Sequence, residues 1–85
     1  MKEQTAGKIR AQWRHQDEQW GRGQLARMKS WEILALLTDE LGGLARAIME
    51  WDASGTVKGA QRVEEELLRV AGLAARWLDE CFSDE

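Results

Sequence analysis

This chain of 85 residues is poor in several residue types, and each shortage narrows the possible folds and sites. It contains no proline, no tyrosine, one cysteine and one histidine. The single cysteine, Cys81, excludes an intramolecular disulfide and is typical of a reducing compartment. His15 has no second histidine or cysteine near it in the sequence, so the sequence does not predict a zinc site.

Long apolar runs are also missing. No stretch approaches the ~20 apolar residues that cross a bilayer, and Met1–Gln4 does not lead into the apolar core of a signal peptide. We therefore expect a cytoplasmic protein without a membrane partner. Residues 1–85 make one domain, and a chain this short buries only ~60–65% of its unfolded surface. We expect a second copy to complete the core, as a homodimer or tetramer.

The net charge of −3 hides an uneven distribution along the chain. Residues 1–29 carry seven basic and three acidic side chains, a net +4, whereas residues 30–85 carry five basic and twelve acidic ones, a net −7. A basic segment can bind the phosphates of nucleic acid. These basic side chains do not form a dense run, however. We therefore expect them to lie on a solvated face and to pair with acidic side chains of another copy, and we do not expect a nucleic-acid partner.

Helical periodicity is strongest in residues 30–52. Apolar side chains recur there at steps of three and four, which is the pattern of one face of an α-helix: Ile33, Leu37, Leu41, Leu44, Ile48 and Trp51. Ser30 is the expected N-cap, and Glu32 in the first turn suits the positive end of the helix dipole.

Two further helices are predicted on either side of this segment. The helix over residues 3–20 has one apolar face, interrupted by Gln16 and made by Ile9, Trp13 and Trp20. The helix over residues 57–82 has an apolar centre of Val63, Val70, Ala74, Trp77 and Cys81. Three helices with short connections predict an all-α fold, an antiparallel bundle of about three helices.

Two carboxylates next to these apolar faces are the candidate chemical groups. At about 100° per residue, Glu40 falls at the edge of its stripe and Glu66 falls within the apolar half of its helix. A buried carboxylate is costly without a cation or hydrogen bonds. Arg62 and Arg69 stand one turn to either side of Glu66 and can neutralise it. Alternatively, Glu66 faces Glu40 across the bundle and the two hold Mg²⁺, which prefers hard oxygen ligands. The sequence leaves both possibilities open.

Two motifs resemble the MazG-like family of all-α nucleotide pyrophosphohydrolases. Leu37–Ile48 reads LTDELGGLARAI, and Glu65–Ala74 reads EELLRVAGLA. The family pattern is Glu-Glu-x-Gly-Glu-Leu-Ala on one helix and Glu-Glu-Leu-x-Asp-Val on a later one. The sequence Gln19-Trp20-Gly21 also resembles phage and mobile-element relatives of that family. The resemblance covers roughly residues 16–80.

The resemblance implies a dimeric or tetrameric bundle that holds Mg²⁺ and hydrolyses a nucleoside triphosphate to the monophosphate and pyrophosphate. By position, it implies two catalytic residues, Glu40 and Glu66. The implied metal ligands are the same two residues and their neighbours, Asp39 and Glu65. Arginine binds phosphate well and tryptophan stacks on bases. On these chemical grounds, the predicted substrate-binding residues are Arg69, Arg62 and Trp20.

The chain departs from the family pattern at two metal-ligand positions. Gly43 stands where the first motif has its second Glu, and Arg69 stands where the second motif has its Asp. Fewer anionic ligands weaken Mg²⁺ binding, so one expectation is a pyrophosphohydrolase-like protein of reduced activity. The alternative is a non-catalytic helical oligomerisation or interaction module that keeps the fold. That alternative predicts that Glu66 contacts Arg62 or Arg69 instead of Glu40.

Overall fold

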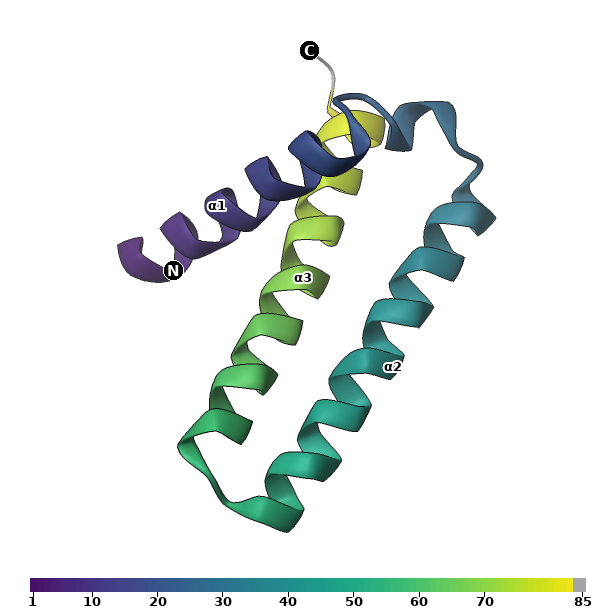
Figure 1. Ribbon diagram of the computed structural model, residues 1–85. Coiled ribbons are helices and arrows are strands. Elements are labelled where there is room, and N and C mark those ends of the chain that lie inside the picture. Colours follow the sequence, from purple (N-terminus) through teal and green to yellow (C-terminus); the bar gives the residue numbers. More distant parts are fainter. Residues whose placement is uncertain (84–85) are drawn as a thin grey trace.

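The computed structural model describes residues 1–83, which form three long α-helices and one short 3₁₀-helix (Figure 1). The long helices are α1 (Glu3–Trp20), α2 (Ser30–Ser54) and α3 (Val57–Phe82), and η1 (Leu25–Arg27) lies between α1 and α2. The described residues contain no strand, so the all-α prediction is confirmed. The second helix runs two residues beyond its predicted end at residue 52.

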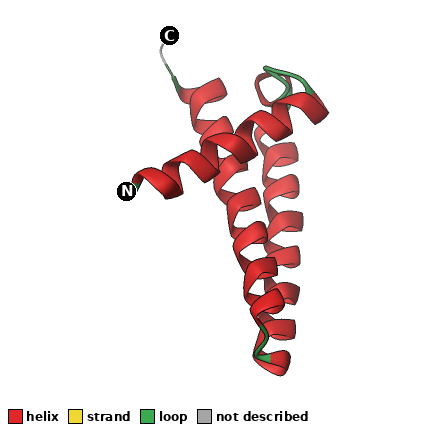
Figure 2. Ribbon diagram, turned by 60° about the vertical axis from the view of Figure 1, so that its left-hand side comes forward, coloured by secondary structure: helices red, strands yellow, loops and turns green. Residues whose placement is uncertain are grey.

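The helices α2 and α3 form a long antiparallel hairpin, and α1 crosses the upper part of α3 (Figures 1 and 2). The main partner of α1 is α3. The part of the hairpin near the α2–α3 turn therefore consists of two helices without a third (Figure 1). Among residues 1–83, no helix is long and apolar enough to cross a membrane.

Both ends of α2 follow from local chemistry. The prediction of Ser30 as N-cap is wrong, because Ser30 is the first helical residue and Lys29 is the N-cap. The Lys29 backbone N–H donates to the Glu32 carboxylate at 2.8 Å. At the other end Gly55 adopts φ 63°, a left-handed conformation that favours glycine. The Thr56 hydroxyl then accepts the Gly59 N–H at 3.0 Å and starts α3. The result is a tight reversal of the chain.

The core lies at the upper end of the hairpin. Three apolar side chains are almost completely buried there, Leu25, Ile33 and Leu73, with four partly buried ones around them, Met28, Leu36, Leu37 and Trp77. The predicted stripe of α2 is buried only in part, since Leu41, Ile48 and Trp51 keep 40–46% of their surface exposed. The reason is geometric: no third helix of this chain covers that stretch of the hairpin (Figure 1).

A fully buried arginine joins α1 to α3. The Arg76 guanidinium lies 3.2 Å from Asp17 Oδ1 and 3.4 Å from Glu80 Oε2, and its Nη2 donates to the Gly21 carbonyl oxygen at 3.4 Å. Its Cζ lies 5.5 Å from the centre of a Trp20 ring, within the range of a cation–π contact. Arg76 therefore fixes the C-terminal end of α1 against α3.

Replacing Arg76 tests this role. We expect Arg76→Met to lower the free energy of unfolding by about 2–3 kcal/mol, because Asp17 and Glu80 lose their shared cation. This is below the usual loss for a buried pair, since both carboxylates keep some contact with water. Urea denaturation followed by circular dichroism measures it. Arg46→Met, at an exposed position, is the control and should change stability by less than about 0.5 kcal/mol. Equal losses in the two variants would contradict the role given to Arg76.

Candidate functional site

A polar pocket of about 280 Å³ lies where α1 crosses the hairpin, and we call it the Trp20 pocket. Glu40 of α2 and Arg69 of α3 line it together with five residues of α1, Gln12, His15, Gln16, Gln19 and Trp20. Three of the site residues predicted from the sequence, Trp20, Glu40 and Arg69, thus come from three helices to one pocket. Amide, imidazole, guanidinium and carboxylate groups around an aromatic ring can bind a polar ligand with a flat apolar part.

The pocket environment changes the acidity of Glu40. Partial burial raises the pKa of its carboxyl group above the ordinary 4.5, because the charged form loses water. The Arg69 guanidinium acts in the opposite direction, and the negative charges of Glu66 and Asp39 raise the pKa further. Glu40 and Glu66 are therefore close enough to influence each other, with the positive charge of Arg69 nearby.

Glu66 is the buried acid of the site, with 4% of its surface exposed. Its Oε1 lies 3.3 Å from Arg69 Nη1, which donates a hydrogen bond, and 3.6 Å from Arg62 Nε. A methyl group at Gly43 would lie only 3.0 Å from Glu66 Oε2, so the absence of a side chain there leaves room for the carboxylate. Of the two possibilities that the sequence leaves open, the arrangement observed is neutralisation of Glu66 by the two arginines.

The other residues implied by the resemblance lie outside the Trp20 pocket. Asp39 is exposed on α2. Arg62 and Glu65 line a hollow of about 510 Å³ next to the α2–α3 turn. The predicted site residues therefore do not all gather in one pocket.

The side chains present do not fit the Mg²⁺ site that the resemblance implies. Within residues 1–83, no three His, Cys, Asp or Glu side chains are grouped so that they could hold a metal ion. Glu66 is the one buried carboxylate among residues 1–83, and its Oε1 already lies beside two guanidinium groups. Mg²⁺ requires several oxygen ligands at close to octahedral geometry. The described side chains do not form such a set of ligands.

Two buried residues at the crossing of α1 and α3 do not follow from the sequence pattern. Gln16, which interrupts the predicted face of α1, is the buried residue of that helix with 3% of its surface exposed. Arg76 is the largest fully buried side chain. A weak signal for Arg76 does exist, because it follows the buried Leu73 by three residues and so shares its face of α3.

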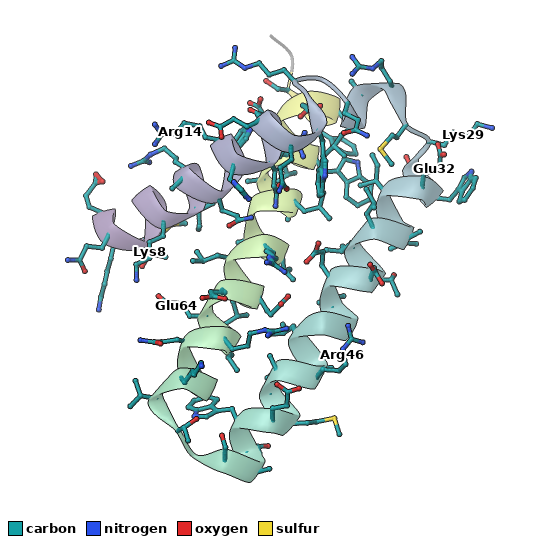
Figure 3. The ribbon with its side chains drawn as sticks, in the orientation of Figure 1. Lys8, Arg14, Lys29, Glu32, Arg46 and Glu64 are labelled. Carbon is teal, nitrogen blue, oxygen red and sulfur yellow. The ribbon has the colours of Figure 1, made fainter. Side chains whose placement is uncertain are left out.

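The basic N-terminal segment is partly neutralised within the chain. Lys8 of α1 and Glu64 of α3 point toward each other and form an ion pair of 2.6 Å (Figure 3). A hollow of about 470 Å³ borders the other flank of α1, and as many carboxylates as arginines line it: Arg10, Arg14, Arg22, Asp17, Asp79 and Glu80. Positive and negative side chains therefore balance in this hollow.

Comparison with known proteins adds no relative: no family model matches the chain, and no match was found among curated proteins or solved structures. The MazG-like resemblance therefore stays a prediction that rests on the two motifs.

The environment of Glu40 predicts a pH-dependent stability. Because its pKa is raised in the folded chain, the folded state binds this proton more tightly than the unfolded state, and stability falls as pH rises through the range just above 4.5. We expect Glu40→Gln to be more stable than the wild type at pH 7, with the difference shrinking as the pH falls below 4.5.

Denaturation of both proteins between pH 3 and 8 measures this difference. Glu50→Gln, at an exposed position on the same helix, is the control and should change stability by less than about 0.5 kcal/mol. A Glu40→Gln variant that is less stable than wild type at pH 7 would show that the carboxylate stabilises the fold instead.

Proposed function

We propose that this chain is a MazG-like protein that binds a nucleoside triphosphate in the Trp20 pocket and hydrolyses it slowly. One observation carries the proposal: Trp20, Glu40 and Arg69, far apart in the sequence, line the same pocket. All three are site residues predicted from the sequence. The pocket lies near Glu66, through the contact of that residue with Arg69.

Each of these three residues has a chemical role in the proposal. The Trp20 ring offers a stacking surface for a base, and the Arg76 guanidinium fixes it at 5.5 Å. Arg69 uses Nη1 to contact Glu66 and has further N–H donors for phosphate oxygens. Its side chain is half exposed, so a ligand can reach it.

Slow hydrolysis follows from the same groups. The Glu40 carboxylate can accept a proton from a water that attacks a phosphorus atom, and a raised pKa suits a general base near neutral pH. Arg69 can neutralise charge that develops on the phosphate oxygens. The bond from the attacked phosphorus to the bridging oxygen breaks and pyrophosphate leaves. Without a fitting set of metal ligands, we expect this reaction to be slow and nucleotide binding not to depend on Mg²⁺.

Calorimetric titration of the full chain with each nucleoside triphosphate, with and without Mg²⁺, tests binding. We expect Arg69→Met to bind at least about tenfold more weakly, because a charge-assisted hydrogen bond is lost. Arg46→Met is the matched control and should bind like the wild type. A pyrophosphate assay should give slow release for wild type and none for Glu40→Gln. Wild-type protein that binds none of the nucleotides would overturn the proposal.

A second candidate function, a helical self-association module, is favoured by two observations. Glu66 contacts Arg62 and Arg69, as the non-catalytic alternative predicts. In addition, α2 exposes three apolar side chains at strict steps of seven residues, Leu34, Leu41 and Ile48, which keep 40–55% of their surface exposed. A seven-residue repeat is the pattern of a helix–helix seam.

The exposed apolar side chains of α3 continue this surface. Leu67, Ala74 and Leu78 share one face of α3, and Ala74 lies about 200° around the helix from Gly72, where α1 packs. In an antiparallel hairpin, that face and the Leu34–Leu41–Ile48 stripe lie on the same side, away from α1. A second copy with the same surface would complete a four-helix bundle. We therefore expect two copies to form a homodimer through this surface, with α1 of each copy on the outer side.

Sedimentation of the wild type should therefore give a dimer, and Leu41→Glu should shift it toward the monomer, because a charge enters the apolar seam. Met49→Glu is the control: Met49 is also exposed but lies roughly 80° around α2 from Leu41, so the dimer should persist. A monomeric wild type, or equal dissociation of both variants, would contradict this surface.

A further inference from the structure

Gln16 occupies an unusual position for an amide side chain. It is the buried residue of α1, and it packs directly on α3 where Gly72 has no side chain. A methyl group at Gly72 would lie 3.3 Å from Gln16 Nε2 and 3.0 Å from Gln12 Cγ. Gly72 thus lets the Gln16 amide reach the backbone of α3 at the wall of the Trp20 pocket.

The two ends of this amide differ in their bonding. Gln16 Nε2 donates to the Arg69 carbonyl oxygen at 3.4 Å. This bond fixes the orientation of the amide, because a flipped amide would place Oε1 against that carbonyl oxygen, and both atoms are acceptors. Gln16 Oε1 is buried and has no hydrogen-bond partner among the described residues. A buried acceptor without a donor is costly, and most buried polar groups in proteins have a hydrogen-bond partner.

We propose that Gln16 Oε1 accepts a hydrogen bond from an amino group at C4 of a pyrimidine or C6 of a purine, so that the pocket selects cytosine or adenine. The inference rests on the proposed function. Trp20 and Gln16 are one helical turn apart on α1 and line the same pocket. A base stacked on the Trp20 ring therefore extends one edge over Gln16. Because Nε2 donates to the Arg69 carbonyl oxygen, Oε1 is the amide atom left to accept a hydrogen bond from a donor that enters there.

The chemistry of the base edge decides which bases fit. In cytosine and adenine the amino group offers two N–H donors to the acceptor. In uracil and hypoxanthine a carbonyl oxygen takes that place and would face Gln16 Oε1, acceptor against acceptor. Gln16 Oε1 therefore favours the base that carries the amino group, which is cytosine over uracil and adenine over hypoxanthine.

The test compares pairs of nucleotides that differ in this one group. Calorimetric titration of the full chain should give about tenfold tighter binding of CTP than UTP, and of ATP than ITP, as one buried hydrogen bond predicts. Gln16→Met keeps the length of the side chain and removes the acceptor, so both ratios should fall close to one. Gln19→Met removes an exposed amide of the same pocket and is the control, for which the ratios should persist.

A further nucleotide tests the inference on wild-type protein alone, whether or not Gln16→Met folds. The triphosphate of 2-pyrimidinone riboside lacks the amino group without gaining a carbonyl oxygen, and it should bind more weakly than CTP. Equal binding of all these nucleotides would overturn the inference and leave the proposed function intact. A preference that persists in Gln16→Met would overturn the role of Gln16, and a wild type that binds no nucleotide would overturn both proposals.

Discussion

The buried guanidinium of Arg76 is the contact on which the rest of this structure depends. It reaches Asp17 at the end of α1, the Gly21 carbonyl oxygen after it, and Glu80 on its own helix. Glu80 in turn accepts the Leu25 N–H at 3.1 Å, which places the completely buried Leu25 in the core. One cation thus sets both the crossing of α1 over α3 and the path of the connection to α2. Without that crossing, Trp20 would not lie opposite Glu40 and Arg69.

The sequence pattern predicts the helices well and their crossing poorly. Steps of three and four apolar residues are a local property, so all three long helices could be found from them. The burial of Gln16 and Arg76 depends instead on partners more than fifty residues away, Arg69 and Asp17 respectively. A helical wheel assigns a polar side chain to solvent because it does not contain those partners. For this reason Gln16 looked like an interruption, although it is the buried residue of α1.

The sequence pattern predicts those residues of the candidate site whose side chains face the crossing of the helices. Trp20, Glu40 and Arg69 lie on faces that turn toward one another, and they meet in the Trp20 pocket. The outward neighbours of the two motif acids, Asp39 and Glu65, point away because consecutive residues on a helix are about 100° apart. Whether Glu66 would face an acid or an arginine could not be decided from spacing, since both lie within reach of a long side chain.

The two positions at which the chain departs from the MazG-like pattern lie beside the same carboxylate. Gly43 leaves space beside Glu66 Oε2, and Arg69 contacts Glu66 Oε1. Counting Arg62 as well, two guanidinium groups accompany the two acids, Glu40 and Glu66. The charges of the site are thereby balanced by its own side chains. Arg69 is half exposed, so it is the group at which an incoming phosphate would compete with Glu66.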